Sequence, residues 1–127
     1  MNESPLYVRT YELILWLIPE LLKFPRTHRF GLAEHLQNLV TEFQDALIAA
    51  GKAQGDERLA LLRKADAYLE QVRVWVRMSR DLRLITMRQY EHISRMMVEI
   101  GRMLGAWMKK VQAEKTGSAG RLVEQQS

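Results

Sequence analysis

The sequence predicts an all-α protein, an antiparallel up-down-up-down four-helix bundle. Four segments carry apolar residues at the three- and four-residue steps of a helix, and no stretch shows sustained strand-like alternation. Glycine and proline are sparse, at seven and three residues, which suits long helices joined by short connections. Such connections favour antiparallel neighbours. The 127 residues are enough for one domain with a single core.

The first two predicted helices are separated by Pro25. One begins at Ser4-Pro5, a hydroxyl side chain followed by proline at the first helical position, and Pro19 should kink it. The other covers residues 29–50 and ends at a polar turn that contains two glycines. The apolar faces are Ile14, Leu17, Leu21 and Phe24 in the first helix, and Leu32, Leu36, Leu39, Phe43, Ala46 and Ala50 in the second.

The third predicted helix extends from Asp56, a good N-cap residue, to about Leu82. Two neighbouring rows of apolar side chains cover roughly 160° of its surface, at about 100° per residue. This arc is wider than one bundle core requires. The rows are Leu62, Ala65, Leu69, Val72 and Val76, and beside them Leu61, Tyr68, Trp75 and Leu82.

The fourth predicted helix opens at Thr86, with Gln89 three residues later, the spacing of a capping box. Residues 114–127 follow it and lack a clear apolar stripe. We therefore divide the chain into a bundle domain, residues 1–113, and a mobile polar tail, residues 114–127. The apolar seam of the helix is Tyr90, Ile93, Met97, Ile100, Leu104, Trp107 and Val111, widened on one side by Met96 and Met103.

No motif indicates catalysis, a cofactor or a bound metal. The chain has no cysteine and no phosphate-binding glycine loop, and it contains neither HExxH nor ExxH. Gly101 and Gly105 form a GxxxG, which we interpret, together with Trp107, as helix-packing positions. We expect a non-catalytic protein that acts by binding partners. The three histidines are scattered along the sequence: His28, His35 and His92.

The apolar run in residues 13–22 is interrupted by Pro19 and Glu20. It is also too short to cross a bilayer, which needs about 20 apolar residues. We interpret the run as a buried helix and expect neither a signal peptide nor a membrane partner. Since the absence of cysteine suits a reducing compartment, we expect a cytoplasmic protein.

Basic side chains form two rows that could bind nucleic acid or an acidic partner. The net charge of +4 and the pI of about 9.6 modestly favour a polyanion. The alternative is a solvated face with salt bridges, because Glu91 and Glu99 are each four residues from Arg95, and Asp66 and Glu70 lie near Arg73. Most members are arginines, whose planar fork suits phosphate and carboxylate. The rows are Arg73, Arg77 and Arg80 on a flank of the third helix, and Arg88, Arg95, Arg102 and Lys109 nearly opposite the seam of the fourth.

Apolar side chains flank the seams in excess. They either thicken the core, where methionine fills irregular gaps, or form a band that is buried between protomers. We favour oligomerisation. The flanking residues are Tyr68, Trp75, Leu82, Met96 and Met103.

Three stretches resemble a known family. FPRTHRFGL (residues 24–32) resembles the joint between the first two helices of the bacterial four-helix-bundle family, which includes proteins encoded within intervening sequences of large-subunit ribosomal RNA genes. ADAYLEQVRVWVRM (residues 65–78) and VEIGRMLGAWMKK (residues 98–110) are similar to its Avd branch, the accessory variability determinants of diversity-generating retroelements. The similarity covers residues 6–111 and omits the tail.

The resemblance implies a homopentameric ring of four-helix protomers that associates with the reverse transcriptase of the retroelement and binds RNA or DNA through a basic surface. Avd proteins support mutagenic retrohoming, in which template RNA is copied with errors at adenines, while the polymerase chemistry belongs to the partner. The alternative is a structural homo-oligomeric adaptor of the ribosomal RNA intervening-sequence type, without nucleic-acid function. A neighbouring reverse-transcriptase gene would separate the two.

Overall fold

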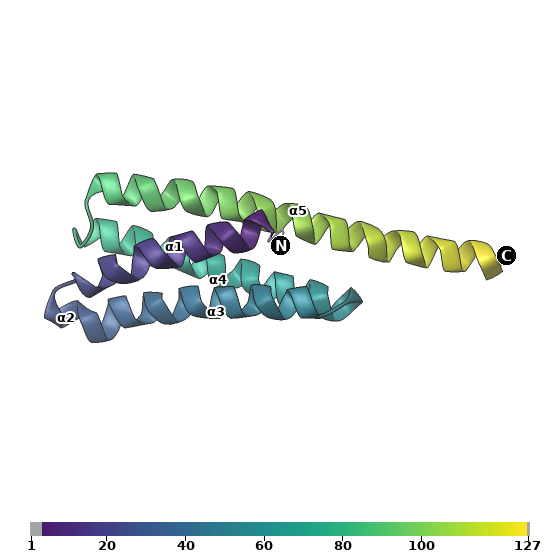
Figure 1. Cartoon of the computed structure of the whole chain (residues 1–127), viewed down its shortest axis with the longest axis horizontal. Coiled ribbons are helices and arrows are strands. Elements are labelled where there is room, and N and C mark those ends of the chain that lie inside the picture. Colours follow the sequence, from purple (N-terminus) through teal and green to yellow (C-terminus); the bar gives the residue numbers. More distant parts are fainter. Residues whose placement is uncertain (1–3, 127) are drawn as a thin grey trace.

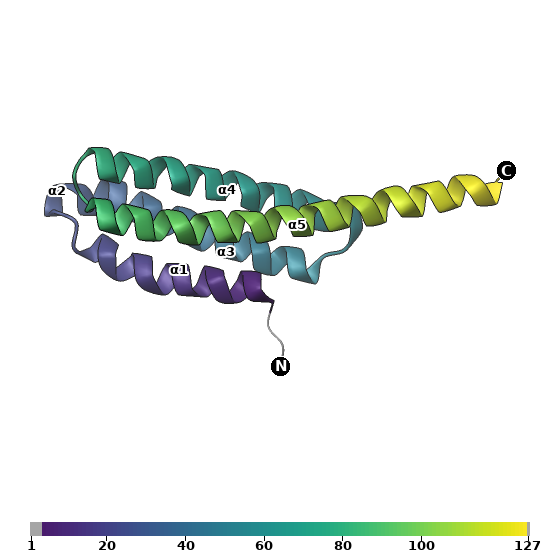
Figure 2. The ribbon, with the colours of Figure 1, turned by 90° about the horizontal axis from the view of Figure 1, so that it is seen from above.

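The computed structural model describes the backbone of residues 4–126 and the side chains of residues 4–117. Four long helices lie side by side and reverse direction at each connection (Figure 1), and a second view shows the same packing (Figure 2). No strand occurs in the described residues, so the predicted all-α four-helix bundle is confirmed. The elements are α1 (Pro5–Leu22), α2 (Arg26–His28), the π-helical η1 (Arg29–Ala33), α3 (Glu34–Lys52), α4 (Gly55–Asp81) and α5 (Met87–Gln126).

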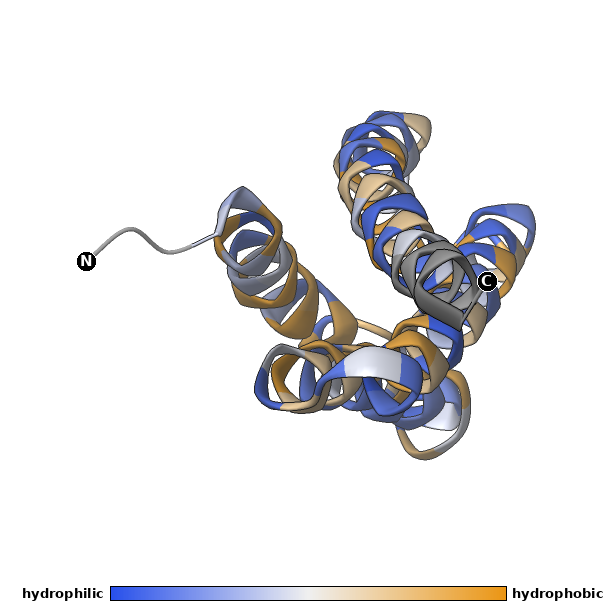
Figure 3. Ribbon diagram, turned by 90° about the vertical axis from the view of Figure 1, so that its right-hand side faces the viewer, coloured by the Kyte–Doolittle hydropathy of each residue, from blue (hydrophilic) through white to orange (hydrophobic). Residues whose placement is uncertain are grey.

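One continuous core holds these helices together. Leu13, Phe43, Leu62 and Ile100, one from each long helix, are all fully inaccessible to solvent. Burying such a side chain stabilises the fold by roughly 1.5–3 kcal/mol, so packing rather than helix propensity keeps the helices in place. Helix α3 packs most extensively on α4, and α1 packs on α5 and α3. Seen along the bundle, each helix carries both hydrophobic and hydrophilic residues around its circumference, as amphipathic helices do (Figure 3).

Of the two helix caps predicted for α5 and α4, the structure confirms one and contradicts the other. The capping box of α5 is confirmed: the Gln89 N–H donates to Thr86 Oγ1 at 3.1 Å, and the Thr86 N–H donates to Gln89 Oε1 at 2.7 Å. The predicted Asp56 cap of α4 is wrong. The N-cap is Gln54, without a side-chain cap bond, because Gly55 enters the helix at φ +58 and places Asp56 in the first turn.

The joint between α1 and α3 is more helical than the sequence indicates. The chain re-enters a helix at Arg26, directly after Pro25, three residues before the predicted start at residue 29. Within η1, the Glu34 N–H donates to the Arg29 carbonyl five residues earlier, which is the π-type bond. Helix α1 itself continues through Pro19.

Most of the flanking apolar side chains contribute to the core of their own chain. Tyr68, Trp75, Met96 and Met103 are half-buried against it, and of the five only Leu82 is an exposed large hydrophobic, at 50%. The arc on α4 is wide because it faces two neighbours, α3 and α5. Large apolar side chains that are more than half exposed occur elsewhere instead: Tyr11, Leu15 and Leu22 on α1, Phe30 in η1, and Met87 and Val98 on α5.

Helix α5 continues beyond the bundle (Figures 1 and 2) and runs to Gln126. The segment that we divided off as a tail from residue 114 is thus helical as far as Gln126, although it has no apolar stripe. A helix that is already formed propagates more easily than it starts, so it can extend without a packing face. Side chains 112–117 are all exposed, and one ion pair links them to the bundle, Lys115 Nζ to Asp56 Oδ1 at 2.7 Å.

Candidate nucleic-acid and partner interface

The four predicted cations of α5 form one exposed row, here called the α5 row: Arg88, Arg95, Arg102 and Lys109. Their seven-residue spacing is close to two helical turns, so successive members are about 10 Å apart and the row covers about 30 Å. Among the described side chains, none of the four forms an ion pair. The α5 row is therefore free to meet phosphates or carboxylates.

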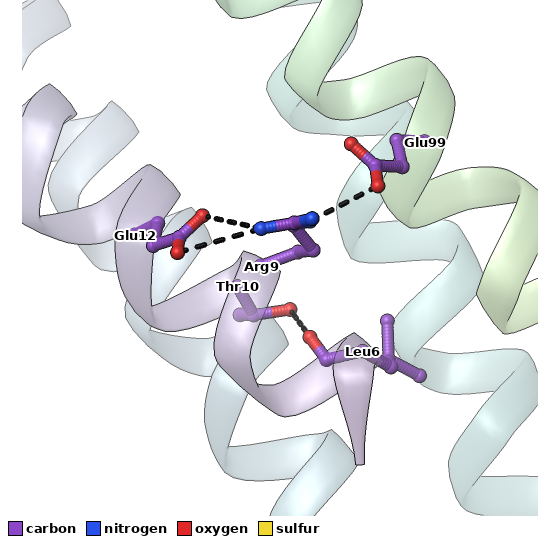
Figure 4. Close-up of polar contacts among 5 residues, drawn as sticks. All are labelled: Leu6, Arg9, Thr10, Glu12 and Glu99. Atoms are coloured by element: carbon purple, nitrogen blue, oxygen red, sulfur yellow. Dashed lines mark hydrogen bonds and ion pairs between the residues drawn. The ribbon is translucent and has the colours of Figure 1, made fainter. Parts of the chain in front are cut away.

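Glu99 leaves Arg95 unpaired because it faces α1 instead. Arg9 Nε donates to Glu99 Oε1 at 3.0 Å, and Arg9 Nη1 meets Glu12 Oε2 at 3.1 Å (Figure 4). The hydrogen bond to Glu99, followed by the one to Glu12, raises the pKa of the Arg9 guanidinium above its ordinary value. Glu99 therefore does not form the salt bridge with Arg95 that the alternative of a solvated face requires. It links α5 to α1 instead.

The predicted cluster on α4, here the α4 cluster (Arg73, Arg77 and Arg80), is partly engaged by the protein itself. Arg73 Nη1 pairs with Glu70 Oε2 at 3.1 Å. Arg80 Nη2 pairs with Asp81 Oδ1 at 2.8 Å, and its guanidinium lies 4.4 Å from the centre of the Tyr90 ring, a cation–π distance. Only Arg77 is exposed and without an ion pair among the described residues.

A groove of about 280 Å³ separates α4 from α5 beside this cluster. Arg73 and Arg77 line it together with Val74 and Val98. Val74 is 37% exposed and Val98 is 55% exposed, so the groove presents both cations and apolar surface. This mixture suits an amphipathic protein segment better than a bare phosphate backbone.

The three predicted packing positions differ from one another. A Cβ at Gly101 would collide with Nη2 of Arg73, so this glycine lets Arg73 lie across α5. Trp107 packs against the core and meets the Tyr7 ring edge-on, with ring centroids 6.2 Å apart. A Cβ at Gly105 would meet nothing within 4 Å among the described atoms, so no described residue packs closely against this position.

A pocket of about 590 Å³ lies between the N-terminus of α1, the C-terminus of α3, the start of α4 and α5. Met103 and Trp107 make it largely apolar, and its one cation, Arg58, donates to the carbonyl oxygens of Ala50 and Gly51 at 2.9 and 3.3 Å. Tyr7 donates to the Leu47 carbonyl at 2.9 Å, and burial raises the pKa of its hydroxyl. Sequence reasoning missed this pocket because residues from four helices create it.

His28, His35 and His92 do not converge. His35 lies against the Trp75 ring and His92 against the Trp16 ring, at centroid distances of 5.0 and 4.9 Å. No group of three or more metal-ligating side chains is found in the part of the chain that the structure describes. In the same part, no helix has the length and apolarity that crossing a bilayer requires.

Comparison with known proteins identifies the family and the fold. The model of the family described as bAvd-like matches residues 6–111. A protein of unknown function from the S23 ribosomal protein family of Bacteroides thetaiotaomicron has a similar structure, with a TM-score of 0.73, 18% sequence identity, and coverage of 82% of this chain and 98% of that chain. No curated protein matches. The predicted resemblance is confirmed for the family, and the structural neighbour supports the four-helix fold.

Proposed function

Because this chain belongs to the bAvd-like family, we propose that it is a non-catalytic accessory protein of a diversity-generating retroelement. In this proposal it binds nucleic acid, template RNA or its DNA copy, and the reverse transcriptase of the retroelement through basic surfaces. It thereby supports mutagenic retrohoming, while the polymerase performs the copying chemistry.

The observation that carries the proposal is the α5 row. Four exposed cations lie along one helix face, and no acidic side chain among the described residues pairs with them. Phosphates attract such a row without regard to sequence, and each contact releases counterions, so binding weakens as salt rises. The groove beside the α4 cluster, with Arg77 and exposed apolar side chains, is the surface we assign to the reverse transcriptase.

We further propose that the protein assembles into a homopentameric ring. Support comes from the exposed apolar residues on α1, of which Leu15 and Leu22 are 58% and 64% exposed, and from the open space at Gly105. A ring would repeat the α5 row around an axis and strengthen its field. Light scattering coupled to size exclusion tests this assembly: a pentamer is expected, and a species of 14.9 kDa at micromolar concentration contradicts it.

A structural homo-oligomeric adaptor of the ribosomal RNA intervening-sequence type, without nucleic-acid function, is the second candidate. The resemblance of residues 24–32 to the bacterial four-helix-bundle family supports it, and the structural neighbour from the S23 ribosomal protein family shares the fold. The two candidates differ in one measurable property, because the adaptor should not bind RNA or single-stranded DNA in a salt-dependent manner.

The decisive experiment replaces the α5 row with glutamine. Binding of labelled RNA and single-stranded DNA, and co-purification with the reverse transcriptase of the same element, are compared between this variant and the parent. A matched control removes the same number of charges at exposed positions outside both rows. Loss of nucleic-acid binding in the row variant alone supports the proposal, and equal binding by the row variant and the parent refutes it. The control positions are Lys52, Arg63, Lys64 and Lys110.

A further inference from the structure

One end of the bundle combines exposed aromatic and apolar surface with unpaired cations. It contains the joint that connects α1 to α3 and the turn that connects α4 to α5, and both views place these two connections at the same end (Figures 1 and 2). We call residues 23–33 and 82–88 the turn end. Neither the α5 row, apart from Arg88, nor the groove beside the α4 cluster belongs to it.

Phe30 is the most exposed large hydrophobic residue among those described, at 81%. It lies in η1, where Leu32 and Ala33 turn into the core while Phe30 points away from it. A π-helical turn of this kind often marks a functional position. The Phe30 ring is exposed to solvent. A buried phenylalanine would stabilise the fold, so the exposed ring does not serve stability.

Cations flank this ring on the same short segment. Arg26 and Arg29 are exposed, and neither forms an ion pair among the described residues. The nearby Lys23 is paired with Glu20 at 3.2 Å, so it contributes less free charge. Glu34 is an exposed acid that follows η1, yet the described contacts pair it with neither arginine.

Arg83 supplies an independent observation from the second connection. It is the one non-glycine residue with positive φ among those described, at φ 60. The Arg83 N–H donates to the Arg80 carbonyl at 2.9 Å and the Leu84 N–H to the Ser79 carbonyl at 2.8 Å, which together form a Schellman motif. Glycine is the usual residue at this position, because a side chain there strains the backbone. An exposed arginine in this place points to a role for its side chain.

We propose that the turn end binds an unpaired nucleotide of single-stranded nucleic acid, with the base stacked on Phe30 and the flanking phosphates held by Arg26, Arg29 and Arg83. An exposed ring can stack on a base only if the base is free of a duplex, whereas arginine forks recognise the phosphates of any strand. The inference rests on the nucleic-acid part of the proposed function. It adds a second contact surface and a preference for unpaired strands.

The test compares labelled single-stranded oligothymidylate with a duplex of the same length. Phe30→Ala should weaken single-strand binding roughly 5- to 100-fold, the usual effect of removing a stacked aromatic, and leave duplex binding unchanged. Phe30→Trp should retain the binding, and Phe30→Leu should be as weak as Phe30→Ala because it keeps the apolarity and loses the ring face. Ile48→Ala is the control, since Ile48 is an exposed large hydrophobic of α3, at 48%, outside the turn end and outside the surfaces assigned to the protomer contact and the reverse transcriptase.

Arg83→Gly tests the cationic part without damage to the fold, because glycine adopts the positive φ without strain. It should reduce the slope of log affinity against log salt for the single strand by about 0.7, as expected for one phosphate contact. Circular dichroism and thermal melting should match the parent or exceed it. An unchanged slope would remove Arg83 from the proposed site.

The outcomes separate this inference from the proposed function. If the α5 row variant loses binding while Phe30→Ala binds single strands like the parent, the proposed function is supported and the turn-end site is refuted. If Phe30→Leu retains full single-strand binding, or if Phe30→Ala loses only co-purification with the reverse transcriptase, the ring is an apolar contact for protein and the site is also refuted. If the parent binds no nucleic acid, both proposals fail.

Discussion

The α4 cluster and the α5 row look equivalent in the sequence but differ in the folded protein. In the α4 cluster, Arg73 and Arg80 have acidic partners, and Arg80 also lies against the Tyr90 ring. In the α5 row, no member is paired among the described residues. Spacing on a helix determines which face a side chain occupies. The acids that pair with Arg73 and Arg80 lie on α4 itself, whereas Glu99, four residues from Arg95, pairs with Arg9 of α1 instead. The partners that the nearby acids find after folding therefore decide whether a cation stabilises the fold or remains available to a ligand.

The largest expected difference is in nucleic-acid affinity and its salt dependence. Replacing the α5 row with glutamine should flatten the slope of log affinity against log salt by up to about 3–4, since each lost phosphate contact contributes about 0.7–0.9. Replacing the α4 cluster should flatten it by about 1 at most, because only Arg77 is unpaired. Titrations at several salt concentrations measure both slopes. Equal slopes in the two variants would contradict the claim that the α5 row binds phosphates and the α4 cluster mostly does not.

Stability should show the opposite order. Glutamine at Arg73 and Arg80 removes two ion pairs and one cation–π contact, which should lower the free energy of unfolding by about 1–2 kcal/mol in total. Each exposed position of the α5 row should change it by no more than about 0.5 kcal/mol. Urea unfolding of the two variants provides the comparison. A marked loss of stability or a changed subunit number in the α5 row variant would place the row in a contact between protomers.

Gly101 and Gly105 of α5 allow a contact within the chain to be distinguished from a contact between protomers. Gly105→Leu has open space within its own chain, so any loss of about 1–3 kcal/mol, the cost of overpacking, would reveal a neighbouring protomer at this position. If the ring forms at Gly105, the variant should have a lower subunit number in light scattering. Gly101→Leu is the counterpart, because its side chain would displace the Arg73 guanidinium within the same chain, so any change in stability should be the same at every protein concentration. Unchanged assembly and stability in Gly105→Leu would show an exposed position.

The smallest expected effect concerns Arg83. Arg83→Gly should raise the free energy of unfolding by about 0.5–1 kcal/mol, because the positive φ no longer carries a side chain. Thermal melting of the parent and the variant at low protein concentration measures this gain. A lower free energy of unfolding in the variant would mean that the Arg83 side chain stabilises the turn. Arg83 would then act within the fold, as Arg80 does, and would not be free for a ligand.

Local patterns predicted the four helices, most of the core and the capping box at Thr86, because each depends on residues a few positions apart. Contacts between distant segments defeated sequence reasoning. Arg9 takes Glu99 from 90 residues away, and the flank of α4 is covered by the chain's own helices. The N-cap of α4 is Gln54 and not the predicted Asp56, because the chain enters the helix at Gly55 with a positive φ. This backbone turn outweighs the preference of aspartate for the N-cap position. The turn end escaped notice because the sequence does not show that Phe30 is exposed, nor that the turn with Arg83 lies at the same end of the bundle.

Helix α5 is 40 residues long, yet only its first part has neighbours to pack against. In hydrogen exchange, a single helix should therefore show two regimes. Amides near Ile100 and Leu104 lie in the core and should exchange only when the whole bundle opens, whereas those of residues 112–117 lie where all side chains are exposed and should exchange by local fraying. The transition between the regimes should come just after Val111, the last buried residue described in α5. Binding of a partner to the projecting segment would then appear as slower exchange in residues that are otherwise the first to open.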